Sequence, residues 1–362
     1  MAGMEYRILL GAVPATRGEL DRFEEIRIDQ RVAMATEAEL VIPICIDRQG
    51  RWEGYEPYMR LFQRVRIEVR AREGGPFVPL IDGPIVRREG GKNAEPGESA
   101  VTLVVHDDSI FLNREESDHR FDGRSLPSVV EALFELADEI DTVEVELPPK
   151  GTGLPDVLIQ RSTPIHLLRR LAHATGMQVQ VRPGARAGRS VGVFRRLPDG
   201  PTDRPPLVLV GPDRNVEELD LNDDGQAPAR VTGYTLDAAT KEVRRSDSGA
   251  GAGTVADRPE RGQLLRRDDL VDMDVLVSAA AERSAWSVEA RGSLRTDCYG
   301  AVLEPFCVVP VHGAGAEDSG TYTVFGVRHT LGRSRYEQQF TLRRKPVAGP
   351  VGAAAAALAE IF

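Results

Sequence analysis

The sequence predicts an α+β fold that is mostly β, with an α/β unit between two β-rich regions. In the opening third, Val65, Ile67 and Val69 alternate with charged residues, which is the period-2 pattern of a half-buried strand. The same alternation returns near the end, where Phe340 and Leu342 share one face of an extended segment. Between these regions the apolar residues recur at helical spacing instead.

The first β-rich region is expected to cover residues 1–120. A strand is expected at residues 77–86, and the apolar run at residues 101–105 is typical of a strand buried on both faces. Residues 89–98, rich in glycine and charge, predict a loop. The favoured interpretation of the arginines at residues 64–72 is a solvated strand face, and contact with a polyanion or an acidic partner subunit is the alternative.

An α/β middle domain is expected over residues 121–225. Ser125 is placed to cap one helix, and a second helix is expected to start at Ser162 or Thr163 and to end at Gly176. Short strands are expected after these helices, at residues 142–147 and 177–181. A third helix is expected later in the chain, over residues 268–285.

The second β-rich region is expected over residues 226–345. Its clearest strands lie between Trp286 and Arg344, and Pro305 and Pro310 indicate that the strand between them is an edge strand or is bulged. Near the start of this region, the glycine-rich residues 246–262 predict a mobile loop.

The C-terminal tail, residues 346–362, passes from proline and glycine into five consecutive alanines and then into larger apolar residues. This pattern predicts a segment that becomes ordered only against a partner. The interface residues predicted in it are Ala353, Leu358, Ile361 and Phe362.

Length, charge and cysteine content limit the classes of function. A chain of 362 residues is long enough for about two or three domains. The formal net charge of −10 argues against general or sequence-specific nucleic-acid binding, which needs surplus lysine and arginine. Three scattered cysteines do not make a disulfide framework, and no stretch resembles a signal peptide or a membrane span. The sequence therefore predicts a protein synthesised in the cytoplasm and not inserted into a membrane.

The sequence predicts no catalytic, cofactor-binding or metal-binding residue. Motifs for phosphate binding, a nucleophilic serine or a zinc protease do not occur in it. His166 and His173 share a helical face with arginines, which repel a metal ion, so a solvated face is favoured. A second set lacks the spacing of a zinc site and is assigned a structural role: Cys298, Cys307, His312 and His329. A third set is assigned to surface charge: Asp138, Glu139 and Asp141.

Five segments, taken in order, resemble the late control protein D family, the central hub proteins of contractile phage tails, tailocins and contractile injection systems. The N-terminal part of the type VI secretion spike proteins is similar. The segments are Leu80–Val86, Leu103–Ser109, Gln160–Ala172 with Gly176, Gly313–His329 and Phe340–Arg344.

This resemblance implies a fold and an assembly. The fold would have two small antiparallel β-barrel domains joined by an α/β insertion domain, with the helix at residues 268–285 joined to the insertion. Three copies would form a homotrimer with six barrels, which matches a six-fold tail tube to a three-fold spike. The implied partners are a separate spike protein, the tail tube ring and other baseplate subunits, and the protein would become part of an assembled phage tail or injection particle.

Two other classes of function remain as alternatives to this structural, non-enzymatic role. A tail-associated cell-wall hydrolase would need a buried, convergent pair of carboxylates in the middle domain. A carbohydrate- or peptide-binding module would need more exposed aromatic residues than the 6% aromatic content suggests.

Overall fold

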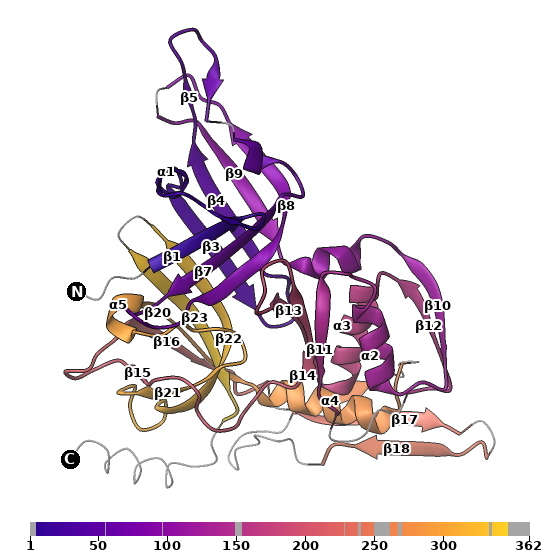
Figure 1. Cartoon of the computed structure of the whole chain (residues 1–362). Coiled ribbons are helices and arrows are strands. Elements are labelled where there is room, and N and C mark those ends of the chain that lie inside the picture. Colours follow the sequence, from indigo (N-terminus) through magenta and orange to yellow (C-terminus); the bar gives the residue numbers. More distant parts are fainter. Residues whose placement is uncertain are drawn as a thin grey trace.

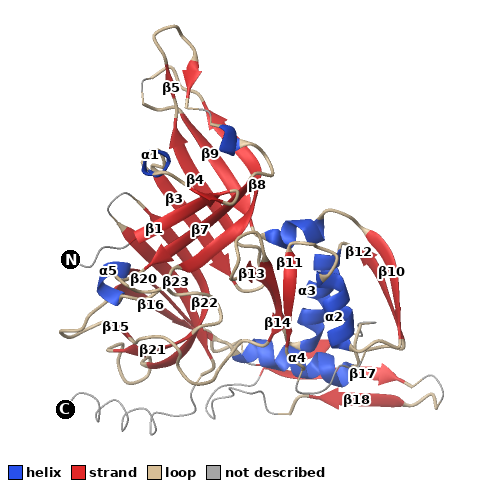
Figure 2. Cartoon of the chain, viewed as in Figure 1, coloured by secondary structure: helices blue, strands red, loops and turns tan. Residues whose placement is uncertain are grey.

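A computed structural model describes residues 5–54, 56–95, 97–148, 154–227, 229–237, 240–249, 261–266, 270–332 and 335–346. Strands account for 46% of these described residues and helices for 16%, so the expected α+β fold that is mostly β is confirmed. The longer helices gather on one side of the molecule, beside the main β-structure (Figure 2).

One sheet of 13 strands, almost entirely antiparallel, runs through both β-rich regions (Figure 1). Its order is β16 (Val216–Asp223), β20 (Val288–Arg295), β23 (Tyr336–Arg344), β22 (Gly320–Leu331), β3 (Glu25–Arg31), β4 (Glu37–Pro43), β9 (Ala100–His106), β8 (Val78–Gly91), β7 (Arg64–Arg70), β1 (Glu5–Leu10) and β2 (Val13–Pro14). Beside this path, β21 (Val308–His312) pairs with β22, and β15 (Leu207–Val208) pairs with β21.

The pairing of β22 with β3 joins two regions that the sequence suggested as separate units. Each region still has its own apolar core. The first contains residues such as Ile28, Leu40 and Ile67, and the second contains residues such as Val309 and Phe340. The division of this sheet into two barrels stays a prediction.

Short elements complete the two regions. They are α1 (Arg17–Leu20), β5 (Cys45–Ile46), β6 (Trp52–Glu53), α5 (Thr296–Tyr299) and the 3-10 helices η1 (Pro57–Met59) and η2 (Asp108–Asn113). A capping box between Thr16 and Glu19 starts α1, because each side chain bonds the backbone N–H of the other residue. At α5, Gly300 takes the left-handed conformation that ends the helix.

The middle of the chain forms an α/β unit with a third apolar core. Its elements are β10 (Ser117–Asp122), α2 (Leu126–Phe134), β11 (Ile140–Val145), β12 (Val157–Ser162), α3 (Pro164–Thr175), β13 (Gln178–Pro183) and β14 (Ser190–Arg195). Ser125 caps α2, and α3 lies between Thr163, whose side chain makes no capping bond, and Gly176 at φ 75°, so both predicted helices are present. Strands β11, β14 and β13 form one small sheet, and β10 and β12 form another.

A later segment returns to this unit. It contains β17 (Ala229–Leu236), β18 (Val243–Asp247), β19 (Arg261–Leu265) and α4 (Met273–Ala285). The expected third helix is therefore present, and its residues share the apolar core of α2 and α3. The β17 strand lies within residues 226–345, which were expected to belong to the second β-rich region, but its residues Ala229 and Val231 pack in the core of the middle unit.

Two local expectations differ from the structure, and a third is confirmed. Strand β8 continues to Gly91, into the segment expected to be a loop. The expected edge strand between the two prolines is confirmed, because Val308 and Val309 of β21 pair only with β22, and β15 joins β21 only beyond Pro310, at Val311 and His312. The expected mobile loop at residues 246–262 begins within β18 and ends within β19, and residues 250–260 lie outside the described residues.

Candidate functional surface

A row of polar side chains crosses seven neighbouring strands of the main sheet on one face. Each residue is the direct register partner of the next, from β16 to β9. The members of this cross-strand row are Glu218, Ser293, Gln339, Arg328, Asp29, Glu37 and His106. The row passes over the β22–β3 junction without interruption, so the two β-rich regions present one continuous polar face.

An ion pair and a hydrogen-bonding contact within the row connect neighbouring strands. Arg328 Nε donates to Asp29 Oδ1 at 2.8 Å across the junction, and the ring of His106 lies 2.7 Å from a carboxylate oxygen of Glu37. Opposite charges on directly paired strands stabilise a sheet modestly, by roughly 0.2–1 kcal/mol for each pair. The row therefore helps to keep the two regions in register.

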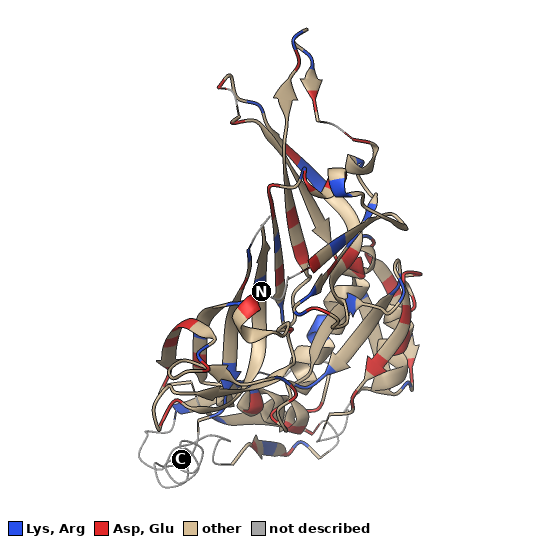
Figure 3. Ribbon diagram, turned by 60° about the vertical axis from the view of Figure 1, so that its left-hand side comes forward, with Lys and Arg blue, Asp and Glu red and all other residues tan. Residues whose placement is uncertain are grey.

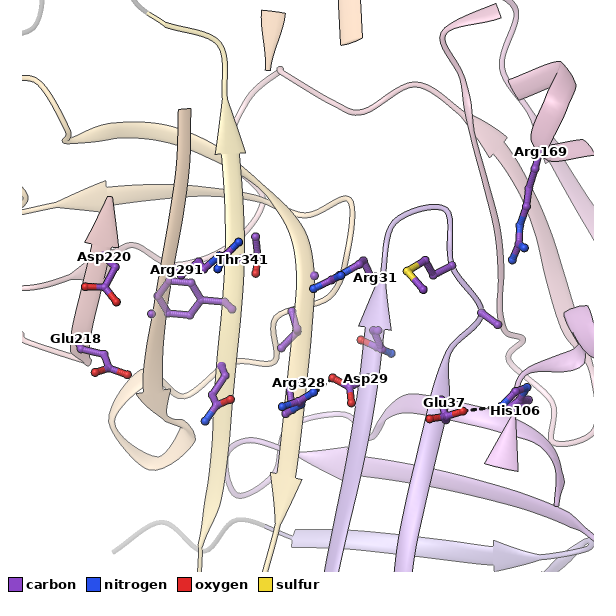
Figure 4. A pocket seen from close by; sticks show the side chains of 18 residues that line it. Asp29, Arg31, Glu37, His106, Arg169, Glu218, Asp220, Arg291, Arg328 and Thr341 are labelled. Atoms are coloured by element: carbon purple, nitrogen blue, oxygen red, sulfur yellow. Dashed lines mark hydrogen bonds and ion pairs between the residues drawn. The ribbon is translucent and has the colours of Figure 1, made fainter. Parts of the chain in front are cut away.

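A groove of about 910 Å³ lies over this face (Figure 4). Most of its lining comes from the cross-strand row and its neighbours, and Arg169 reaches it from α3 of the middle unit. The charged lining consists of Asp29, Glu37, Glu218 and Asp220 with Arg31, Arg169, Arg291 and Arg328. Four carboxylates thus face four guanidinium groups, and acidic and basic residues are interspersed in the same way over much of the chain (Figure 3).

This charge balance limits what the groove can do. A site for a polyanion would show a surplus of cations, and a metal site would show convergent carboxylates without arginines between them. Among the described residues, no group of three or more histidine, cysteine, aspartate or glutamate side chains is arranged to hold a metal ion. The groove has the character of a mixed-charge surface.

A second polar feature is a buried charge cluster between the first β-rich region and the middle unit. Arg64 bonds both Asp82, at 2.7 Å, and Asp108, and both of these carboxylates have no exposed surface. Arg66, which is also buried, bonds Asp82 at 2.9 Å and Glu68 at 2.7 Å. The expected solvated face for the arginines of this strand is therefore wrong at its first two members, because carboxylates from neighbouring elements fold over them.

The connection between β13 and β14 docks onto this cluster. Gly188 donates its backbone N–H to Asp82 Oδ2 at 2.9 Å, and Ser190 Oγ donates to Asp108 Oδ2 at 2.6 Å. In the other direction, Arg66 donates to the carbonyl oxygen of Gly184 at 2.9 Å. The contact is thus made by charge-assisted hydrogen bonds, which are about twice as strong as neutral ones.

Burial raises the pKa of Asp108 to about 6, and its bonds to Arg64 and Ser190 oppose this shift without cancelling it. A buried carboxylate pair with a raised pKa is the feature that a hydrolase in the middle domain would need. Here, however, both carboxylates are closed to solvent and already bonded to arginines. The sequence hardly indicates this carboxylate pair, because Asp82 and Asp108 lie 26 positions apart on different elements.

The predicted structural role of His329 has a clear basis in the structure. Its Nδ1 lies 2.8 Å from Tyr336 Oη and its Nε2 lies 3.2 Å from Gln30 Oε1, while Gln30 Nε2 donates to the carbonyl oxygen of Leu80. Complete burial lowers the pKa of His329 to about 3, so the ring is neutral at physiological pH. This buried network ties β22, β23, β3 and β8 together beneath the cross-strand row.

The other sequence candidates are dispersed. Cys307 is buried whereas Cys298 is exposed, and both thiols are free. His166 lies exposed on α3, and the acidic group near residue 140 is used in surface pairs, such as that of Asp141 with Arg186. The predicted interface residues Ala353, Leu358, Ile361 and Phe362 lie outside the described residues. No described helix is both long and apolar enough to cross a membrane.

This architecture has counterparts among solved structures. No protein-family model matches the sequence, and no curated protein sequence matches it. Among solved structures, the tail protein from Neisseria meningitidis has a TM-score of 0.65 and 16% identity, over 94% of this chain and 96% of that chain. The 43 kDa tail protein of prophage MuSo2 from Shewanella oneidensis has the same TM-score and identity, over 94% of this chain and 98% of that one.

The chain has the fold of phage tail proteins. A further similar structure is a component of the type VI secretion system of E. coli, described as similar to the bacteriophage T4 tail proteins gp27 and gp5. It has a TM-score of 0.55 and 15% identity, over 91% of this chain and 74% of that chain. The resemblance to tail hub proteins is thus confirmed at the level of the phage tail protein fold, which in this chain carries the cross-strand row and the buried charge cluster.

Proposed function

We propose that the protein is a structural baseplate hub of a contractile tail or injection system, a homotrimer that matches a six-fold tail tube to a three-fold spike. The observation that carries this proposal is the continuous sheet, in which two β-rich regions of one chain stand side by side with a common polar face. Three copies of such a chain would present six β-units, while the assembly itself keeps three-fold symmetry.

Two open strand edges of the main sheet support a ring of this kind. At one end, β16 pairs only with β20 among the described strands, so its outer edge is open. Within the sheet, β7 pairs with β8 only as far as Pro84, and from Arg87 to Gly91 the partner of β8 is β9 alone, so this part of β8 also has an open edge. A ring forms when two different edges of one chain meet between successive copies, which is a heterologous contact.

These two edges carry complementary charge. Exposed carboxylates dominate β16: Glu217, Glu218, Asp220 and Asp223. The exposed end of β8 and the residue after it contain Arg87, Arg88 and Lys92 with a single acid, Glu89. We therefore propose that β16 of one copy lies against the end of β8 in the next. Backbone hydrogen bonds would give affinity, and the charges would select this pairing over contact between like edges.

The partners proposed for the ring are the tail tube ring, a separate spike protein and other baseplate subunits. The tail residues Ala353, Leu358, Ile361 and Phe362 are proposed to take part in partner contacts. The protein would be made in the cytoplasm and then built into the particle. The hydrolase alternative is disfavoured because the buried carboxylate pair has no access for a substrate, so the role proposed is not enzymatic.

The test is the mass of the purified protein, alone and with its spike partner, measured by light scattering. Reversing charge on one edge, with Glu217→Arg and Glu218→Arg or with Arg87→Glu and Arg88→Glu, is expected to weaken the trimer. Combining both pairs of substitutions is expected to restore it. Glu131→Arg, on the exposed surface of α2, is the matched control. A persistent monomer in all conditions, or insensitivity to either reversal, would contradict the proposed ring.

A further inference from the structure

The sheet formed by β18, β17 and β19 has an inner and an outer face. On the inner face, Gly233 of β17 lies against Met273 of α4, and a Cβ at this position would lie 2.2 Å from the Met273 sulfur. Leu265 of β19, the register partner of Gly233, packs against the same core. Because successive side chains of a strand point to opposite faces, every second residue of the three strands points away from α4.

The outer face carries large apolar side chains that nothing in the described part of the chain covers. Tyr234 is 48% exposed, Leu236 56%, Val243 67% and Leu264 68%. Leu236 and Val243 are direct register partners, and Leu264 pairs with Thr232, two positions before Tyr234 on the same face. These four residues form one contiguous apolar patch, which we name the β17 patch.

The end of the described chain lies close to the helix beneath this patch. Lys345 Nζ lies 2.6 Å from Glu282 of α4 and 2.9 Å from Asp199, and it stands over the ring of Trp286 at 5.3 Å. Met273, which packs under the patch, is nine residues before Glu282, or about 14 Å along the helix. Lys345 therefore holds the end of the described chain near one end of α4. The patch lies on the outer face of the strands that pack on the other end.

Residues 347–362 can reach the patch and have the side chains to cover it. The eleven residues from Val347 to Ala357 span up to about 36 Å, whereas the path is about 14 Å along α4 plus about 10 Å across the sheet. Leu358, Ile361 and Phe362 then follow at the spacing of one helical face. Glu360 lies among them, and Arg245 borders the patch beside Tyr234.

The other undescribed segments near the patch do not match it in composition. Residues 250–260 contain one large apolar side chain, that of Val255, and residues 238–239 and 267–269 contain none. We propose that the β17 patch is the docking site of this chain's own residues 347–362, with Leu358, Ile361 and Phe362 against Tyr234, Leu236 and Leu264. A spike or baseplate subunit that binds the tail would have to take it from this patch. The proposal does not depend on the ring.

Hydrogen exchange of the full-length protein, read by mass spectrometry, tests the docking from both sides. The triple variant Leu358→Ser, Ile361→Ser and Phe362→Ser is expected to exchange about tenfold faster in β18 and β19, which corresponds to about 1.4 kcal/mol of lost protection. The matched control, with Ala354, Ala355 and Ala356 changed to serine, is expected to leave these strands unchanged.

The reciprocal variants lie on the patch. Leu264→Asp, or the milder Leu264→Ser, is expected to speed exchange in residues 351–362, while Val13→Asp, an equally exposed site on β2, is expected to have no effect there. Because Leu264 is exposed, both variants are expected to fold. Unchanged exchange in both directions would overturn the proposal. Protection that disappears on dilution would replace it with docking on a second copy, and protection that appears only with the spike would assign the patch to that partner.

Discussion

Arg66 donates a hydrogen bond to the carbonyl oxygen of Gly184, a residue 118 positions later in the chain, at 2.9 Å. The guanidinium belongs to the first β-rich region and the carbonyl belongs to the middle unit. Of the first region, the apolar core of the middle unit includes only side chains of η2, Leu112 and the partly buried Phe111. The position of the middle unit against the sheet therefore depends heavily on the buried charge cluster.

Arg66→Met is expected to destabilise the protein by about 3–5 kcal/mol, because it leaves Glu68 and Asp82 as buried carboxylates that have lost a partner. Chemical denaturation measures the loss, and hydrogen exchange is expected to rise first at residues 184–190. Arg120→Met removes an exposed pair with Asp122 and is expected to cost less than about 1 kcal/mol. Equal effects of the two substitutions would show that the cluster does not hold the middle unit.

The raised pKa of Asp108 gives a pH dependence of defined sign. The folded protein binds this proton near pH 6, whereas an ordinary aspartate does so at 3.8, so lowering the pH from 7 to 5 favours the folded state at this site. The expected gain is about 1 kcal/mol in the wild type relative to Asp108→Asn, in which the site cannot titrate. Urea unfolding of both proteins at pH 7 and pH 5 measures it. A difference that stays constant between the two pH values would contradict the shift.

The buried network around His329 predicts that removing a single oxygen atom from it strongly lowers the stability of the protein. Tyr336→Phe leaves His329 Nδ1 buried without its partner, which is expected to cost about 1–3 kcal/mol in the free energy of unfolding. Tyr234→Phe removes the same oxygen from a half-exposed residue and is expected to change stability very little. Thermal and chemical unfolding of these two variants, measured under the same conditions, decide whether burial of the hydroxyl group accounts for its contribution to stability.

The close approach of another backbone segment to Gly83 predicts that a larger residue at this position destabilises the protein. A Cβ at this position would lie 1.8 Å from the carbonyl oxygen of His106, so Gly83→Ala is expected to force β8 and β9 apart, at a cost of about 3 kcal/mol or more. Gly90, on the same strand, has no neighbouring atom within 4 Å of the equivalent position, and Gly90→Ala is expected to be tolerated. Comparable melting temperatures for the two variants would argue against the close approach.

The parts of this fold that follow from local chemistry could be predicted from the sequence. The cap at Ser125 and the left-handed Gly176 bound their helices as expected, because helix ends are decided by neighbouring residues. The burial of Arg66 could not be predicted in the same way. Its partners Asp82 and Gly184 come from other elements, and an arginine on a strand carries no sign of which carboxylates will surround it.

The cross-strand row shows the same limit at a larger scale. Asp29 and Arg328 each read as an ordinary polar residue on an exposed strand face, and their ion pair depends on β3 meeting β22. Periodicity predicts both strands, but it does not predict which strand lies beside which. The β-rich regions were accordingly recognised as two, and their union in one sheet was not.

The junction of β3 with β22 also has a consequence for synthesis. Asp29 and Arg328 are 299 residues apart, so at roughly 5–20 residues per second a ribosome needs about 15–60 s after making β3 before it has made the partner strand. During that interval the edge of β3 is an open template for other strands. A nascent or prematurely terminated chain would therefore be prone to aggregation, and chaperone binding would be most useful over this stage. A finished chain covers that edge itself, which makes complete translation a condition for a well-behaved subunit.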